Sequence, residues 1–404
     1  MKYLVLVGDG MADRPLKELE GATPLEVART PNMDLIAREG MVGNAVTVPE
    51  GLQPASDVAN MALLGYDPRK YYSGRGPLEA ANMNITLKES DVAFRCNLVT
   101  ISDDKMADYS AGHITNKEAE VIIKFIDKKL GSDAIKFYPG ISYRHLAVID
   151  SAKIGLKKED LLSAACTPPH DILGKPIARY LPHGAASGYL TDLMLKSKDS
   201  LSRHDVNRVR VDLGENPANM IWLWGQGVKP DMPSFKEKFN VTGSIISAVD
   251  LIKGLGKIIG LEPIDVPGAT GYYDTDYLAK AKYALESLKN KDFVFVHVEA
   301  PDEAGHNGDL REKIAAIENF DKLVVGTVLN AFKDKSEDFR ILVVPDHATP
   351  LSVRTHTRDP IPFAMYGKGI SKDDIDSYNE VAAKKSSLFI EDGFKILEMF
   401  FKES

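Results

Sequence analysis

The sequence predicts an α/β fold built on a mainly parallel sheet, and two observations lead to this class. Short apolar runs recur without the polar–apolar alternation of a half-exposed sheet, which indicates strands covered on both faces. Stretches with the apolar spacing of helices lie between these runs, and alternating strands and helices define an α/β protein. The candidate strands are Tyr3–Val7, Ile221–Trp224, Phe293–Val298, Ile341–Val344 and Pro362–Tyr366.

The candidate helices carry recognisable start and stop signals. Thr30 is a potential N-cap, Pro31 suits the first helical position, and Gly40 ends the stretch. The segments Asp274–Asn290 and Arg311–Phe332 have the helical spacing of apolar residues. We therefore expect a helix in each of these three places.

The middle of the chain has a different character. Between about Ala80 and Asn216 lie segments that suggest a separate domain: strand-like Val92–Ile101 and His145–Ile149, helix-like Asn116–Lys129, and Thr167–Gly188, which is rich in Pro, His and Gly. The span is long enough for an independent domain. We expect a discontinuous catalytic domain at 1–79 and 217–404, interrupted by a smaller inserted domain at 80–216.

Length and composition narrow the class of protein. A chain of 404 residues suggests two or three domains, at roughly 150 residues each. The net charge of −8 argues against a nucleic-acid partner, because phosphate binding needs a basic face. No apolar run reaches the roughly 18 residues of a membrane span, and Met1–Asp9 does not resemble a signal peptide.

The cysteines suit a reducing compartment. Cys96 and Cys166 are the two cysteines of the chain, too few for a disulfide framework or a zinc site of thiolates. We expect a cytoplasmic enzyme without a membrane partner, and the sequence leaves its oligomeric state open.

Acids and histidines follow or adjoin several candidate strands. They are Asp9, Asp302, His306, Asp346, His347 and His356. Ligands of open α/β sheets bind at the carboxyl ends of strands, so we expect these side chains to meet. Mixed oxygen and imidazole ligands suit Mn²⁺, Co²⁺ or Zn²⁺. The set exceeds the needs of one ion with an open position and suits two ions ~3.5–4 Å apart.

Individual members of this set have simpler interpretations. Asp9 precedes Gly10, and an Asp-Gly pair is a common turn. His297 lies inside an apolar strand, where a hydrogen-bonded core histidine is the favoured interpretation. The metal hypothesis therefore rests on several strand ends together.

Ser56 is the candidate nucleophile. Gln53–Asn60 reads as a loop that enters a helix running to Leu64, with Ser56 at the helix start. The local sequence alone favours a plain N-cap, worth about 1 kcal/mol. Beside a dinuclear metal site, however, the serine could attack phosphorus, while the helix N-terminus supplies N–H groups to phosphoryl oxygens.

Taken together, these residues resemble the alkaline phosphatase superfamily, and more closely the cofactor-independent phosphoglycerate mutases of the archaeal type. The stretches that carry the resemblance are Leu6–Asp13, Thr30–Asp34, Pro54–Asp57, Tyr72–Pro77, Ser110–Ile114, Ser142–His145, Pro217–Asn219, Trp222–Gly227, Val266–Gly271, Glu299–His306, Pro345–His347 and Arg354–Thr357. The resemblance implies an alkaline-phosphatase-like three-layer sandwich with a mainly parallel sheet and an inserted α+β lid domain.

The resemblance also implies roles for single residues. Asp302, His306 and His356 would bind one divalent ion, and Asp9, Asp346, His347 and the Ser56 oxygen would bind the other. His113 would transfer protons to and from substrate hydroxyls, and Arg144 and Arg75 would hold the substrate. Arg203, His204 and Lys253 are further candidates for contact with a carboxylate or phosphate.

The activity implied is the interconversion of 3-phosphoglycerate and 2-phosphoglycerate without 2,3-bisphosphoglycerate. Ser56 would take the phosphoryl group and return it to the other hydroxyl of the retained glycerate. The inserted domain would exclude water, which would otherwise hydrolyse the phosphoserine. Alternatives are a metal-dependent phosphatase or phosphopentomutase on the same core, or a non-catalytic metabolite sensor.

Overall fold

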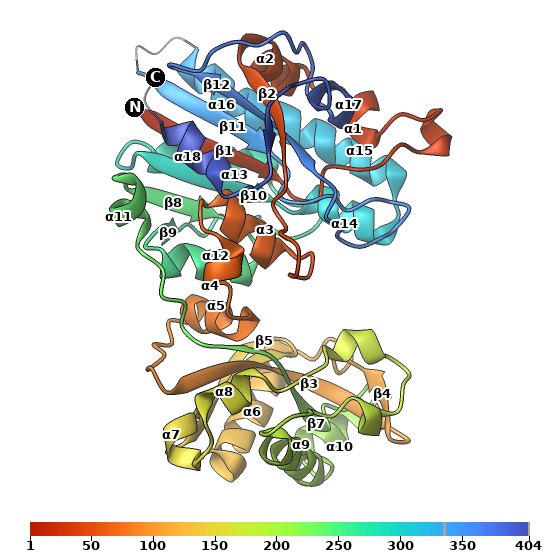
Figure 1. Ribbon diagram of the computed structural model, residues 1–404. Helices are drawn as coiled ribbons and strands as arrows, with labels where there is room; N and C mark the ends of the chain where they lie inside the picture. Colours follow the sequence, from red (N-terminus) through yellow and green to blue (C-terminus); the bar gives the residue numbers. More distant parts are fainter. Residues whose placement is uncertain (334–336, 403–404) are drawn as a thin grey trace. The chain divides into compact units, whose positions relative to one another are not determined.

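The computed structural model describes residues 1–333 and 337–402. Within it the chain forms two compact units, one of Met1–Tyr72 with Asp231–Ser404 and one of Ser73–Pro230 (Figure 1). The expected insertion at 80–216 is thus shorter than the smaller unit at both ends.

The larger unit contains an eight-stranded sheet in the order β13-β2-β12-β11-β1-β10-β8-β9. Its strands are β1 (Lys2–Gly8), β2 (Met41–Ala45), β8 (Gly243–Ile246), β9 (Glu262–Pro263), β10 (Phe293–Val298), β11 (Phe339–Val344), β12 (Ile361–Gly367) and β13 (Phe389–Ile390). Most neighbours pair in parallel, including β1 with both β10 and β11, and β12 runs antiparallel to β11 and β2. The predicted mainly parallel sheet is confirmed.

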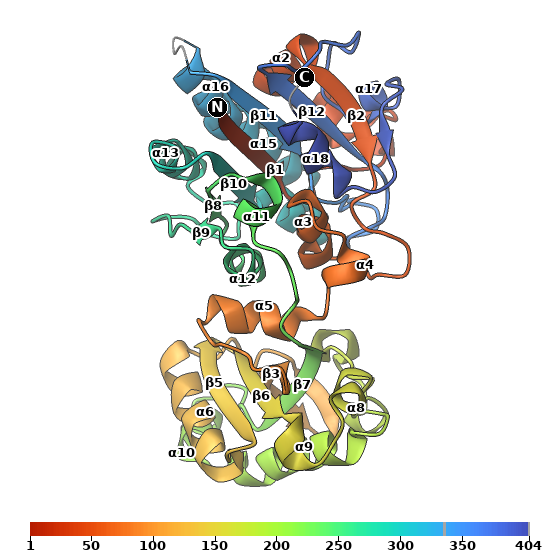
Figure 2. The ribbon, with the colours of Figure 1, turned by 60° about the vertical axis from the view of Figure 1, so that its left-hand side comes forward.

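Helices cover both faces of this sheet, which makes three layers (Figures 1 and 2). One face carries α2 (Pro31–Glu39), α13 (Tyr277–Ser287), α15 (Leu310–Asn319), the π-helical turn η4 (Phe320–Val325) and α16 (Gly326–Phe332). The other carries α3 (Ser56–Leu63), α12 (Asp250–Ile258) and α18 (Lys395–Phe401). Leu4 and Leu6 of β1 pack toward the first group, whereas Tyr3 contacts Phe401 of α18 with ring centroids 4.6 Å apart.

Two of the predicted helices differ in detail from the expectation. Arg311–Phe332 is interrupted by η4, where Asp321 accepts hydrogen bonds from the backbone N–H of Met33 at 2.7 Å and of Asn32 at 3.1 Å. Thr30 occupies the N-cap position of α2 but makes no capping bond with its side chain. A carboxylate distant in sequence caps this helix instead.

The smaller unit is an antiparallel α+β structure. Its five-stranded sheet has the order β4-β3-β6-β5, with β7 on β3, from the strands β3 (Asp91–Ser102), β4 (Lys105–Asp108), β5 (Ile135–Ile141), β6 (Arg144–Asp150) and β7 (Met220–Gly227). Its longer helices are α5 (Arg75–Asn82), α6 (Asn116–Leu130), α9 (Ser187–Leu201) and α10 (Asp205–Asp212).

The sequence places the strand Ile221–Trp224 in the sheet of the larger unit, and this prediction is wrong. The segment lies in β7 and pairs antiparallel with β3, Leu223 opposite Cys96. An apolar run indicates a buried strand without indicating its partner, which explains the error. At the other boundary, α5 packs so closely on β3 that a Cβ on Gly76 would lie 2.1 Å from the Ala93 carbonyl oxygen.

Short elements complete the described chain. They are α1 (Pro24–Val27), α4 (Pro68–Tyr71), α7 (Ser151–Ile154), α8 (Lys158–Leu162), α11 (Phe235–Phe239), α14 (Ala300–Asn307), α17 (Glu380–Ala383), η1 (Lys17–Leu19), η2 (Pro169–Ile172) and η3 (Ile177–Arg179). Over residues 1–333 and 337–402, no helix has both the length and the apolar character required to cross a membrane.

The buried His145 gives the smaller unit a predicted sensitivity to acid. Its Nδ1 accepts a hydrogen bond from the Gly140 N–H at 2.9 Å, and burial lowers its pKa from 6.5 to about 3. Because the unfolded chain binds this proton more readily, stability is full above pH 6.5 and falls as the pH drops toward 3, by about 1.4 kcal/mol per unit inside that window.

We expect His145→Gln to flatten this dependence. Trp222 and Trp224, the two tryptophans of the chain, both lie in β7, so tryptophan fluorescence during urea unfolding reports on the smaller unit. The difference between midpoints at pH 7 and pH 5 should be smaller in the variant than in the parent. Equal differences would contradict the prediction.

Candidate metal centre

Three adjacent strands of the large sheet end in acids and histidines. β1 lies between β10 and β11, so the carboxyl ends of these parallel strands meet at one edge. Asp9 follows β1, Asp346 and His347 follow β11, and α14 after β10 carries Asp302. The side chains predicted to gather do lie close together.

One cluster is centred on Nε2 of His347. The Ser56 Oγ lies 3.1 Å from this atom, and Asp9 Oδ1 and Asp346 Oδ2 each lie 3.5 Å from it. Asp9, Asp346 and His347 are almost fully buried. Two carboxylates, an imidazole and a hydroxyl therefore converge on one small volume.

A second cluster is centred on Nε2 of His306. It lies 2.9 Å from His356 Nε2 and 3.2 Å from Asp302 Oδ2, while His356 Nε2 lies 3.4 Å from Asp302 Oδ1. Thr349 joins the clusters, since its hydroxyl donates to Asp302 Oδ1 and lies 3.2 Å from His347 Nδ1. The rings of His347 and His356 have centroids 4.0 Å apart.

The backbone sets the orientation of His306. Its Nδ1 lies 3.1 Å from the Arg354 carbonyl oxygen, which can only accept, so Nδ1 carries the hydrogen and Nε2 offers its lone pair to the cluster. Arg354 has a φ of +60°, a left-handed conformation uncommon outside glycine. Such strain is typical of functional loops, where the surrounding structure maintains it.

These clusters fit divalent cations on the evidence of their own chemistry. Asp9 Oδ1 is buried and makes no hydrogen bond. Burial raises the pKa of Asp9 well above its usual value, and the nearby Asp346 and Asp302 raise it further. A cation bound at this oxygen would offset the desolvation of the ionised carboxylate. The groups that could hold an ion include Asp302, His347 and His356, and Asp9, His297 and Asp346.

Ser56 is the first residue of α3 and does not cap it. Ala55 occupies the N-cap position, and the Ser56 hydroxyl contacts His347. The plain N-cap interpretation of Ser56 is therefore wrong. Asn60, one turn later, donates from Nδ2 to the Ser56 carbonyl oxygen at 2.8 Å and to Asp346 Oδ2 at 2.7 Å.

The sequence missed several residues that adjoin the clusters. His297 is a buried histidine, as favoured, but its Nε2 lies 3.4 Å from Asp9 Oδ2 and 3.6 Å from Asp346 Oδ2. Behind it lie Glu299 and Lys280. His297 could have been found from its position in β10, which Glu299 directly follows, whereas nothing local marks Lys280.

In the smaller unit, arginines gather around aromatic rings. Arg75 Cζ and Arg95 Cζ lie 5.6 and 4.6 Å from the Trp224 ring centroid, and the His170 ring lies 5.5 Å from the same tryptophan. Burial lowers the pKa of Arg95, and the positive charges of Arg75 and Arg144 lower it further, against the opposing effect of Glu79. Cations crowded in this way favour an anionic ligand.

His113 lies on a strained turn of the same unit. Ala111, Gly112 and His113 all have left-handed φ values, of 50°, 65° and 51°. The Asp108 carboxylate accepts from the Gly112 N–H at 2.7 Å, and Arg210 donates to the Ala111 carbonyl oxygen at 2.8 Å. The exposed His113 ring lies 6.3 Å from that of Tyr143, the neighbour of Arg144.

The structure does not bring the remaining candidates into these groups. Arg203 is exposed in the turn before α10, and His204 caps α10 by accepting from the Val206 N–H at 3.3 Å. Lys253 on α12 pairs with Asp265 at 2.6 Å. His204 has a structural role that accounts for its position.

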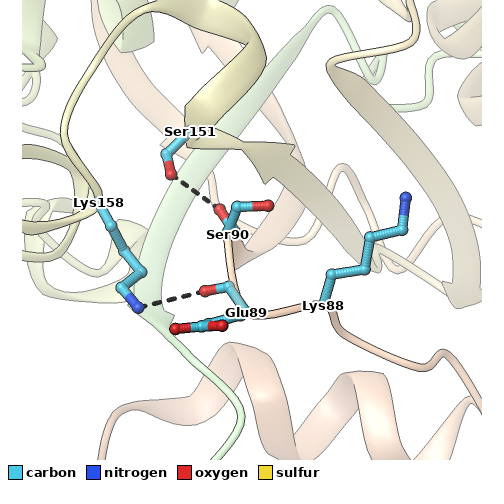
Figure 3. Close-up of a pocket in the computed structure, with 5 residues that line it drawn as sticks. All are labelled: Lys88, Glu89, Ser90, Ser151 and Lys158. Carbon is cyan, nitrogen blue, oxygen red and sulfur yellow. Dashed lines mark hydrogen bonds between the residues drawn. The ribbon is translucent and has the colours of Figure 1, made fainter.

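A hollow of about 470 Å³ in the smaller unit lies apart from all of these residues (Figure 3). Lys88, Glu89, Ser90, Ser151 and Lys158 line it. Lys158 donates to the Glu89 carbonyl oxygen at 3.2 Å, and Ser151 to that of Ser90 at 2.9 Å. Lys158 and Ser151 therefore hold the backbone of the loop that contains Glu89 and Ser90.

The fold and the clusters together define an α/β protein with a paired acid–imidazole centre and a serine at a helix start. A family model described as 2,3-bisphosphoglycerate-independent phosphoglycerate mutase matches residues 37–207. A protein of that name from Methanosarcina barkeri is 53% identical over 389 residues, with 96% of each chain covered. One from Methanothrix thermoacetophila is 51% identical over 399 residues, with 99% of each covered. The chain belongs to the 2,3-bisphosphoglycerate-independent phosphoglycerate mutase family.

Solved structures agree with this assignment. A Pyrococcus horikoshii protein has a TM-score of 0.82 and 32% identity, covering 100% of this chain and 98% of its own. The cofactor-independent phosphoglycerate mutase of Thermoplasma acidophilum has a TM-score of 0.67 and 27% identity, with 99% of each chain covered. The family resemblance read from the sequence is confirmed.

Proposed function

We propose that this protein interconverts 3-phosphoglycerate and 2-phosphoglycerate through a phosphoserine at Ser56, without 2,3-bisphosphoglycerate. The observation that carries the proposal is the Ser56 hydroxyl, 3.1 Å from His347 Nε2 within a cluster of acids and imidazoles. Family membership supplies the substrate class, a small phosphorylated hydroxy acid.

Two divalent cations would complete the centre. Asp302, His306 and His356 would hold one, and Asp9, Asp346, His347 and Ser56 the other, with Mn²⁺, Co²⁺ or Zn²⁺ as suitable ions. Bound there, the ions would lower the pKa of a hydroxyl and neutralise charge on the phosphoryl group.

The chain's own groups would prepare the transfer. As the first residue of α3, Ser56 lies at a helix start, where the positive end of the helix dipole suits phosphoryl oxygens. Asn60 holds the Ser56 backbone by its carbonyl oxygen. The serine would take the phosphoryl group from one substrate hydroxyl and pass it to the other.

The smaller unit would act as the substrate-binding lid. Arg75 and Arg144, with Arg95 and His170 nearby, would hold the glycerate carboxylate, since guanidinium groups bind carboxylates in a bidentate way. Keeping water from the phosphoserine separates a mutase from a phosphatase. Arg203 of the smaller unit and Lys253 of the larger unit are further candidates for contact with a carboxylate or phosphate. A metabolite substrate of this kind fits a cytoplasmic enzyme.

His113 would exchange protons with the substrate hydroxyls. We expect His113→Gln to lower kcat about 10²–10⁴-fold in both directions, the usual contribution of general acid–base catalysis, with little change in KM. The matched control is His183→Gln, at another exposed histidine of the same unit, which should retain parental kinetics. A change confined to KM would assign His113 to binding instead.

The proposal is tested by ³¹P NMR. Protein freed of metal with a chelator is mixed with 3-phosphoglycerate in the absence of bisphosphoglycerate. Mn²⁺, Co²⁺ or Zn²⁺ is then added to separate samples. We expect 2-phosphoglycerate to form only with metal and with little free phosphate. Free phosphate alone would make the protein a phosphatase. No product with any metal would reject the substrate assignment and call for pentose phosphates next.

A further inference from the structure

A buried chain of polar groups lies directly behind the Asp9–Asp346 cluster. Lys280 comes from α13, His297 from β10, and Glu299 directly follows β10. Lys280 and His297 are 0% exposed and Glu299 is 3% exposed. Burying such groups is costly unless each is paired, so this arrangement needs an explanation beyond chance.

Glu299 is held firmly in place. Lys280 forms an ion pair with Glu299 Oε2 and also donates to the His297 carbonyl oxygen at 2.9 Å. Glu299 Oε1 accepts from the Ala248 N–H at 2.6 Å and from the Ser247 hydroxyl at 2.9 Å. The same Oε1 lies 3.4 Å from His297 Nδ1, so the carboxylate faces one edge of the imidazole.

The other edge of His297 faces the candidate ligands. Its Nε2 lies 3.4 Å from Asp9 Oδ2 and 3.6 Å from Asp346 Oδ2. The two carboxylate oxygens of Asp9 therefore face different neighbours. Oδ2 faces His297, whereas Oδ1 faces His347 and makes no hydrogen bond. The oxygen without a partner is on the side where Ser56 lies.

Asn60 makes a further contact with these groups from α3. Its Nδ2 donates to Asp346 Oδ2 and lies 3.4 Å from His297 Nε2. Asp346 Oδ2 also lies 3.5 Å from His347 Nε2, so Asn60 fixes an oxygen that belongs to the metal cluster itself. Groups behind metal ligands commonly fix the direction in which those ligands point.

We propose that His297, oriented by the Glu299–Lys280 pair, is a positioning residue that holds Asp9 with its Oδ1 edge directed at the metal centre. The inference rests on the metal centre of the proposed function but does not depend on the substrate. It predicts that metal affinity depends on the edge of His297 that faces Asp9, and not only on the volume of the ring.

Two amide replacements separate the edges of the ring. A glutamine amide nitrogen reaches the position of Nε2, whereas an asparagine amide reaches that of Nδ1. We expect His297→Leu and His297→Asn to weaken Mn²⁺ binding to chelated protein about 10–100-fold, the usual effect of removing a group behind a ligand. His297→Gln should stay within about threefold of the parent.

Mn²⁺ affinity is measured by isothermal titration calorimetry, with circular dichroism to confirm folding. His145→Leu is the matched control, because it makes the same change at the other buried strand histidine and should leave Mn²⁺ affinity unchanged. At saturating Mn²⁺, the Leu variant should lose kcat while KM for 3-phosphoglycerate stays within about twofold.

A second pair of variants tests the source of the orientation. Glu299→Gln alone leaves Lys280 buried without its charged partner, so Glu299→Gln with Lys280→Met is the cleaner change. The double variant should bind Mn²⁺ more weakly than the parent and resemble His297→Asn. Equal loss in the Gln, Asn and Leu variants of His297 would overturn the edge-specific role, and unchanged affinity in a folded His297→Leu variant would overturn the proposal outright.

Failure of the proposed function gives a different pattern. If the parent binds Mn²⁺ but forms no 2-phosphoglycerate, the substrate assignment fails while the order of Mn²⁺ affinities still decides the role of His297. If the parent binds none of Mn²⁺, Co²⁺ and Zn²⁺, both proposals fail together.

Discussion

Ser56→Ala should reduce the formation of 2-phosphoglycerate by about 10⁴-fold or more, because the proposed phosphoryl carrier is removed. In the described part of the chain, the other hydroxyl beside His347 is that of Thr349, and it already donates to Asp302. Mn²⁺ affinity should change only a few-fold, since Asp9, Asp346 and His347 remain. The variant thus separates binding from turnover.

The measurement pairs turnover with covalent trapping. The parent, quenched in acid during turnover, should carry a phosphate on the peptide that contains Ser56, and the variant should carry none. Ser244→Ala is the matched control, because Ser244 is a buried serine of the same sheet whose hydroxyl accepts from Ser287 at 2.7 Å. A Ser56→Ala variant with a tenth of parental activity would exclude the phosphoserine route.

Much of the larger unit follows from local patterns in the sequence. Continuous apolar strands identify a sheet covered on both faces, and the acids after β1 and β11 locate the edge where the candidate site lies. The pairing of strands does not follow from these local patterns. The run Ile221–Trp224 has the composition of a central strand, but its partner β3 lies in the smaller unit. Composition reports burial, and only tertiary contact selects the partner.

The helix Arg311–Phe332 shows a related limit. Its apolar spacing continues through Phe320–Val325, yet the backbone there forms a π-helical turn. That turn places Asp321 against the first N–H groups of α2, a contact between segments nearly three hundred residues apart in sequence. Apolar periodicity in the sequence reveals neither the extra residue of the π-helical turn nor the distant helix that Asp321 caps.

The residues of the candidate centre also differ in whether the sequence alone could predict them. Residues at strand ends could be predicted because the topology forces them together. Ser56 could not be decided locally, since a serine at a helix start usually caps the helix. Lys280 and Glu299 were unpredictable as a pair, because a lysine in the middle of α13 ordinarily reaches solvent. The two arginines over Trp224 likewise come from separate segments, Arg75 from α5 and Arg95 from β3.

Withdrawing the divalent metal should abolish turnover and destabilise the larger unit. Asp9, Asp302 and Asp346 are buried, the charges of Asp346 and Asp302 act on Asp9, and Asp9 Oδ1 makes no hydrogen bond. Without a cation, burial and mutual repulsion oppose folding of this edge. Mn²⁺ at about 100 times its Kd should restore roughly 2.7 kcal/mol, or about 5–10 °C in Tm.

Hydrogen exchange can locate this stabilisation within the chain. Adding Mn²⁺ to chelated protein should slow exchange in peptides that contain Asp9, α14 and Asp346–His347, where the proposed ligands lie. Peptides from β3 and β6 should exchange at the same rate with and without metal, since no proposed ligand lies on them. Mg²⁺ at the same concentration is the control for ionic strength. Uniform protection of both sets, or a Tm independent of Mn²⁺ concentration, would mean that the clustered acids do not bind the ion, because specific binding at one sheet edge must stabilise that edge first.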